Sequence, residues 1–119
     1  MNTRELWDLG KKYVPDFIGV FPLDKIPTKI VKYPSNFIAN THTANLPGEH
    51  WLAVHCTSQG VVHAFDPFGI YYPKRLRDIL TRMSHPHPVL YNTHRYQNVL
   101  EDTCGYYCIA WLICINIDG

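Results

Sequence analysis

Apolar residues near the amino terminus recur at the spacing of an α-helix. From Thr3 to Tyr13, apolar and charged positions alternate so that Leu6, Leu9 and Tyr13 share one side. Asn2 or Thr3 is available as the amino-terminal cap. This pattern predicts an amphipathic helix at the start of the chain.

The next part of the chain predicts a connection followed by strands. Prolines punctuate residues 15–34, which we expect to form a loop rather than a regular element. β-Branched and aromatic residues then predict strands over residues 37–41, 50–57 and 61–65. The tripeptide Ser58-Gln59-Gly60 separates the last two stretches by a tight turn, so we expect them to pair as a hairpin.

A second helix and a short strand are predicted further along the chain. Pro73 opens a helical pattern that extends to about Met83. Its inward positions are apolar: Leu76, Ile79 and Leu80. Residues 89–91 predict a strand, which begins late because prolines precede it.

The stretch from Cys104 to Ile115 is apolar on nearly every side. In a soluble protein this composition predicts a helix buried in the middle of the fold. Together the elements predict an α+β fold, with a small, mostly antiparallel sheet packed on a central buried helix. The length of 119 residues indicates a single domain, residues 1–119.

Composition and charge limit the class of protein. Hydrophobic residues make up 46% of the chain and charged residues 18%, as in an ordinary soluble globule. A net charge of +1 supports nucleic-acid binding only weakly and predicts no membrane attraction. The amino terminus is charged and lacks the apolar core of a signal peptide, so we expect an intracellular protein, in cytoplasm, nucleus or virion.

The four cysteines are therefore expected to be thiols rather than disulfides. Cys104 lies where a polar loop gives way to the apolar helix, and the amide groups of a helix amino terminus stabilise a thiolate. It is the candidate nucleophile. Cys56, Cys108 and Cys114 are interpreted as small buried apolar residues.

A thiolate nucleophile needs a base, a group that orients the base, and a donor for the oxyanion. His50 begins a predicted strand, and Asp66 follows the strand that pairs with it, so the hairpin brings the two together. Asp66 in an Asp-Pro turn is the alternative interpretation. Gln97 precedes Cys104 by seven residues and is the candidate oxyanion donor, although a loop glutamine is equally ordinary.

These residues give the chain a resemblance to a known family. His50-Trp51, the segment Phe65-Asp66-Pro67-Phe68-Gly69, and Gln97 followed by Cys104-Gly105 stand in the order and at the separations of the adenovirus-type cysteine protease, adenain. Its relatives encoded by Maverick/Polinton transposons share the pattern. At the position of Phe65-Asp66-Pro67-Phe68-Gly69, the viral enzymes have Phe-Glu-Pro-Phe-Gly. An earlier stretch, residues 17–27, also looks like the amino-terminal region of that family.

The resemblance implies a cysteine-proteinase-like fold and a set of roles. Cys104, His50, Asp66 and Gln97 would be catalytic, and Trp51 and Gly105 would contact substrate. Trp51 is equally interpreted as a core anchor. The implied substrates are proteins or peptides cleaved after Gly-containing motifs, in viral or transposon structural proteins.

Other interpretations remain open. Ubiquitin-like-protein proteases of the SUMO type share the order His, Asp, Gln, Cys, and a catalytically decayed binding module would keep the same fold. A zinc-binding domain is disfavoured because the cysteine spacing makes no compact ligand set. We expect neither metal nor cofactor.

Two features differ from the adenain pattern. Fifteen residues follow Cys104, which predicts a form shortened at the carboxy terminus. No cysteine occurs from Thr57 through Thr103, so an activating peptide, if there is one, would bind without a disulfide.

Overall fold

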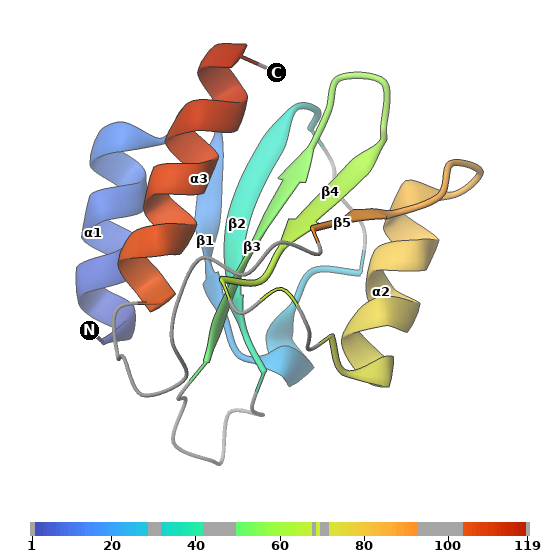
Figure 1. The fold of residues 1–119 in the computed structure, drawn as a ribbon, viewed down its shortest axis with the longest axis horizontal. Coiled ribbons are helices and arrows are strands. Elements are labelled where there is room, and N and C mark those ends of the chain that lie inside the picture. The colour runs from blue at the N-terminus through green and yellow to red at the C-terminus, as the bar shows by residue number, and fades with distance from the viewer. Residues whose placement is uncertain are drawn as a thin grey trace.

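A computed structural model describes residues 2–28, 32–41, 50–67, 69, 72–92 and 104–118, with the backbone alone at Cys104 and Asp118. Its centre is a five-stranded sheet in the order β1-β2-β3-β4-β5. Helices α1 and α3 cover one face of the sheet, and α2 lies on the other (Figure 1). The α+β class expected from the sequence is confirmed.

Helix α1 spans Thr3–Tyr13 as predicted. The side chain of Asn2 caps it, because its Oδ1 accepts a hydrogen bond from the backbone N–H of Glu5 at 2.9 Å. Leu6 is fully buried, but Tyr13 is 51% exposed instead of facing inward. The helix ends there, and the next residue, Val14, enters the core in its place.

The proline-punctuated segment contains a strand that the sequence did not predict. Strand β1, Phe17–Phe21, pairs in parallel with β2, Ser35–Asn40, and is followed by a short 3-10 helix, η1, at Leu23–Lys25. Gly19, at φ +149°, lies at a register shift in this pairing, and a Cβ there would lie 2.5 Å from the Trp7 ring. The expectation of a loop over residues 15–34 is therefore wrong for this part.

The predicted hairpin is confirmed. Strand β3, Trp51–Cys56, pairs antiparallel with both β2 and β4, Val62–Phe65, and Gly60 takes the left-handed conformation at the turn, with φ +83°. Strand β5, Leu90–Tyr91, pairs in parallel with β4. The sheet is thus mixed, with parallel pairs at both edges, and not mostly antiparallel.

Strand β3 is buried along its whole length because helices cover both faces of the sheet. Leu52, Val54 and Cys56 pack on the α2 side, whereas Trp51 and Ala53 pack on the side of α1 and α3. This alternation follows from the two-residue period of a strand.

Helix α2 spans Lys74–Ser84 and begins directly after Pro73, as predicted. Leu76, Ile79 and Leu80 are buried against the sheet, which confirms the inward face. A proline fits before the first turn because its missing N–H would have no partner within the helix.

Helix α3 spans Cys104–Asp118 and lies beside α1 on one face of the sheet (Figure 1). Cys108, Ile109 and Leu112 form its buried side. Its other side is exposed and still apolar: Tyr106, Ala110, Cys114 and Ile117. The helix was expected to be buried all round and Cys114 with it, but α3 covers the sheet from outside, so one side faces solvent.

No helix in the described part of the chain is both long and apolar enough to span a membrane.

Candidate active site

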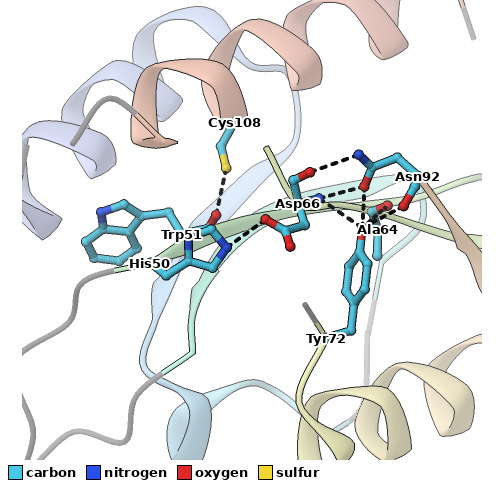
Figure 2. A network of polar contacts seen from close by, with 7 residues as sticks. All are labelled: His50, Trp51, Ala64, Asp66, Tyr72, Asn92 and Cys108. Atoms are coloured by element: carbon cyan, nitrogen blue, oxygen red, sulfur yellow. Dashed lines mark hydrogen bonds and ion pairs between the residues drawn. The ribbon is translucent and has the colours of Figure 1, made fainter. Parts of the chain in front are cut away.

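A histidine and an aspartate from the two arms of the hairpin meet in a charge-assisted contact. Nε2 of His50 lies 2.6 Å from Oδ1 of Asp66 (Figure 2). His50 directly precedes β3 and Asp66 directly follows β4, so the antiparallel pairing brings the two ends together. The Asp66 side chain is fully buried and that of His50 is 13% exposed. A buried carboxylate is stabilised as an anion when it has a cationic or donor partner.

The orientation of the imidazole follows from this contact. Because Nε2 faces Asp66, Nδ1 points to the other side of the ring, where it is shielded from solvent. A carboxylate on one nitrogen fixes the tautomer and the ring plane, which leaves the chemistry to the other nitrogen.

Asp66 also begins a turn, as the alternative interpretation held. Its carbonyl oxygen accepts a hydrogen bond from the N–H of Gly69 at 2.8 Å, and Gly69 has a positive φ of 73°. The turn and the contact with His50 therefore coexist, because one uses the backbone and the other the carboxylate.

Two residues that the sequence did not single out hold the backbone of Asp66. The N–H of Asp66 donates to Oδ1 of Asn92 at 2.7 Å and to the hydroxyl of Tyr72 at 2.9 Å (Figure 2). Nδ2 of Asn92 donates to the Asp66 carbonyl at 2.8 Å. No motif marked Asn92 or Tyr72, since both act on main-chain atoms that every residue carries.

Helix α3 is aligned with β3 by contacts near both of its ends. Close to its start, the thiol of Cys108 donates to the carbonyl oxygen of Trp51 at 3.4 Å. Close to its end, Nδ2 of Asn116 donates to Oδ1 of Asn36 at 3.0 Å, and the same Asn36 oxygen lies 2.7 Å from Nδ1 of His55.

Helix and strand therefore run in the same direction (Figure 1). From Cys108 to Asn116 the helix rises by about 12 Å, and from Trp51 to His55 the strand advances by about 13 Å. The two lengths agree, so the start of α3 lies at the same end of the molecule as His50.

The remaining predicted site residues fall as follows. Cys104 is the first residue of α3, and Gly105, the second, is buried. Trp51 is 5% exposed and belongs to the core between the sheet and the helices α1 and α3. Its interpretation as a core anchor is thus confirmed. Gln97 lies outside the described residues.

The competing cysteines differ from one another in burial. Burial raises the pKa of Cys56 to about 11, against a smaller opposite effect from its hydrogen bond with Ser35. Cys108 is also fully buried, as expected, whereas Cys114 is exposed. A thiol such as Cys56 stays protonated near neutral pH and is a poor nucleophile.

The other described histidines are far less suited to serve as a base. His55 and His63 face each other across β3 and β4, with ring centroids 5.9 Å apart. Burial, and then the neighbouring His63, lower the pKa of His55. His85 and His87 are exposed. Among the described residues no three His, Cys, Asp or Glu side chains gather as a metal site.

An apolar hollow of about 280 Å³ lies between Phe65 and the outer part of α3. Trp111 stacks on Phe65 with ring centroids 5.2 Å apart, and the other walls are Tyr107, Ala110 and Cys114. No Asp, Glu, His, Lys or Arg is among the described residues that line this hollow.

Comparison with known proteins gives a fold-level likeness. No protein-family model and no curated protein sequence matches the chain. Among solved structures, the chain is similar to the crystal structure of the selenomethionine-labelled ASFV pS273R protease, with a TM-score of 0.47 and 20% sequence identity. The match covers 67% of this chain and 34% of that one, so the chain spans about a third of the length of that protease.

Proposed function

We propose that this chain is a cysteine endopeptidase with Cys104 as nucleophile, His50 as general base and Asp66 as the residue that orients His50. The observation that carries the proposal is the contact of 2.6 Å between His50 and the fully buried carboxylate of Asp66. A carboxylate in this position stabilises the imidazolium that forms when the base takes a proton.

The alignment of α3 with β3 supports Cys104 as the nucleophile. Cys108 contacts the carbonyl of Trp51, and Cys104 lies one helical turn, or about 6 Å, earlier on the same side of the helix. His50 lies one residue, or about 3 Å, before Trp51, just outside the start of β3 and at the same end of the molecule.

The chemistry follows from these positions. The first residue of a helix lies at the positive end of the dipole, beside N–H groups that stabilise a thiolate. In the proposed reaction Nδ1 of His50 takes the thiol proton, and the thiolate attacks the carbonyl carbon of the scissile bond. His50 then gives the proton to the departing amine, and water hydrolyses the thioester.

Gln97 is proposed as the oxyanion donor together with the backbone N–H of Cys104. This assignment rests on the sequence, where Gln97 precedes Cys104 by seven residues. A neutral amide suits the task because it donates a hydrogen bond without attracting carboxylates in general.

The proposed substrates carry glycine next to the scissile bond and are structural proteins of a virus or transposon. The resemblance to adenain supports this preference. A narrow channel between Trp51 and the loop from Gln97 to Cys104 would exclude larger side chains. Precursors of ubiquitin-like proteins are the alternative substrates, and binding without cleavage is the alternative outcome.

A labelling experiment tests the proposal. The chain is treated with a peptide-vinyl electrophile ending in Gly-Gly, and the modified cysteine is located by mass spectrometry. We expect addition at Cys104 and cleavage of matching Gly-containing peptides. The Cys104→Ala variant should lose both, whereas Cys114→Ala, which removes an exposed thiol of the same helix, should keep both.

Labelling at Cys114 or Cys56 in preference to Cys104 would contradict the assigned nucleophile. Efficient processing of a ubiquitin-like precursor without cleavage of short peptides would favour the alternative substrates. Peptide binding without labelling or turnover would favour a decayed binding module.

A further inference from the structure

The position of the Asp66 carboxylate depends on the backbone of Asp66, which lies beyond the last paired residues of the sheet. The antiparallel ladder between β3 and β4 ends at the pair of Ala53 and Phe65, one residue before Asp66. A buried N–H or carbonyl beyond the ladder needs another partner, because an unsatisfied backbone group costs stability. Side chains supply these partners.

Asn92 binds Asp66 as a neighbouring strand would. Its Oδ1 accepts from the Asp66 N–H at 2.7 Å, and its Nδ2 donates to the Asp66 carbonyl at 2.8 Å. Both backbone groups of one residue are thus held by one planar amide. Asn92 follows β5, and its own N–H donates to the carbonyl of Ala64 at 3.2 Å, so the residue is fixed to the sheet.

Tyr72 fixes the amide of Asn92. Its hydroxyl donates to Oδ1 of Asn92 and accepts from the N–H of Asp66 at 2.9 Å (Figure 2). Burial raises the pKa of Tyr72, so the hydroxyl keeps its proton and remains a donor. The ring packs against Tyr91 at a centroid distance of 4.5 Å, which ties the hydroxyl to β5.

We propose that Asn92 is a positioning residue for the His50–Asp66 pair and that Tyr72 sets the orientation of its amide. The bonds act on the main chain of Asp66, and its short side chain carries the carboxylate that meets Nε2 of His50. The catalytic part of this inference rests on the proposed function, whereas the positioning of His50 does not.

The two residues of the His50–Asp66 pair are held by different parts of the fold. His50 is joined to α3 through its neighbour Trp51, whose carbonyl accepts from Cys108. Asp66 is joined through Asn92 to β5 and through Tyr72 to the segment before α2. A short contact between groups held from opposite sides is sensitive to small displacements, and a shift of about 1 Å can lower a rate on the order of a hundredfold.

The test compares Asn92→Ala with Ser84→Ala. Ser84 is a matched control because it is buried and its Oγ accepts from the N–H of Val62, at the other end of the same strand, at 3.1 Å. Both changes remove a side-chain partner of a backbone group, Ser84→Ala at the first residue of β4 and Asn92→Ala at Asp66, directly after β4. Tyr72→Phe is a second, milder variant that keeps the ring.

Two measurements are made on each folded variant. The first is the imidazole N–H signal of His50 in NMR spectra of histidine-labelled protein, assigned by its loss in His50→Gln. A short N–H to carboxylate bond places this proton far downfield. The second is the separation of kcat from KM on a cleavable peptide.

We expect Asn92→Ala to remove or move the downfield signal and to lower kcat by roughly ten- to a hundredfold with little change in KM. Tyr72→Phe should act in the same direction and less. Ser84→Ala should leave both the signal and kcat at wild-type values, whatever its effect on the unfolding midpoint.

A wild-type His50 signal in folded Asn92→Ala would overturn the proposal, as would an equal change in Ser84→Ala. If Asn92→Ala does not fold, a wild-type signal in Tyr72→Phe would overturn it instead. The NMR measurement needs no turnover. A signal change without any peptidase activity in the wild type would therefore refute the proposed function and leave the positioning role standing.

Discussion

The thiol of Cys108 donates a hydrogen bond to the carbonyl oxygen of Trp51 at 3.4 Å, and Trp51 is the residue directly after His50. This contact joins the first turns of α3 to the start of β3. The cysteine is fully buried and lies four positions after the proposed nucleophile on the same side of the helix. Cys108 therefore joins the helix that bears the proposed nucleophile to the strand that follows the proposed base.

Replacing Cys108 by alanine should lower both stability and activity. The change removes a buried sulfur and its hydrogen bond, and we expect a loss of about 1–2 kcal/mol in the free energy of unfolding. The rate should fall as well, because the start of α3 loses a contact with the strand that follows His50. Urea unfolding and peptide cleavage measure the two effects.

Cys114→Ala is the control for this change, since it removes the same atoms from an exposed position of the same helix. We expect its free energy of unfolding to stay within about 0.5 kcal/mol of the wild type. Equal losses in both variants would show that Cys108 contributes nothing through its contact with Trp51.

The His50→Ala variant should lose acylation while remaining folded, because His50 lies before β3 and keeps part of its side chain exposed. Loss of a general base is expected to lower the rate on the order of a hundredfold to ten-thousandfold. The measurement is the single-turnover rate of thioester formation. His63→Ala is the matched control, a partly exposed histidine of the same hairpin. If that variant loses acylation and His50→Ala does not, His50 is not the base.

The Gln97→Ala variant should lower kcat by roughly 10²–10³ with little change in KM, because an oxyanion donor acts mainly on the transition state. Steady-state kinetics on a Gly-containing peptide separates the two constants. Gln59→Ala, which changes an exposed glutamine at the hairpin turn, should keep both at wild-type values. A change in KM alone would remove Gln97 from the oxyanion site.

Folding stability should decrease as the pH falls below about 6.5, the ordinary pKa of histidine. Burial and the facing His63 lower the pKa of His55, and burial lowers that of His63. The unfolded chain therefore takes up protons at a pH where the folded chain does not. This contribution to stability is complete above the unfolded pKa and is lost as the pH falls through the folded pKa.

Urea midpoints at about pH 7.5 and about pH 5.5 measure this effect. The His63→Gln variant should show a smaller decrease, because it loses one of the two groups and removes the charge that faces His55. Asn36 and Asn116, which also surround His55, carry no charge and do not titrate. Equal midpoints at both pH values in the wild type would contradict the prediction.

The elements that the sequence predicted well are those set by local signals. The Asn2 cap places the start of α1, Gly60 the hairpin turn, and Pro73 the start of α2. Each of these residues acts within a few positions of itself, so a single sequence is enough to find it.

Strand β1 was missed because its signal is not local. It is stabilised by parallel pairing with β2 and interrupted by Gly19, and the prolines around it resemble those of a loop. The exposed side of α3 was missed for a different reason. An apolar residue such as Ile117, which is 77% exposed, looks in sequence like one in the core.

The residues of the candidate site also divide into those that a sequence signal predicted and those that had no such signal. The hairpin predicted from the sequence implied that His50 and Asp66 meet, and the structure brings them within 2.6 Å. Asn92 and Tyr72 had no such signal, because both bind a backbone atom of Asp66, and Asn92 is distant from Asp66 in sequence. The catalytic roles of Cys104, His50, Asp66 and Gln97 stay predictions.

The parallel course of α3 and β3 restricts how the length of this protein can vary. Cys108 contacts Trp51 of β3, and Asn116 contacts Asn36 of β2, whose Oδ1 also lies 2.7 Å from Nδ1 of His55 in β3. The helix is thus held to the sheet at two levels. One residue inserted between Cys104 and Cys108 would rotate position 104 by about 100° around the helix axis, away from the end of β3 where His50 lies. We expect substitutions on the outer side of α3 to leave this geometry intact, whereas a single insertion or deletion in its first turn would separate the proposed nucleophile from the proposed base.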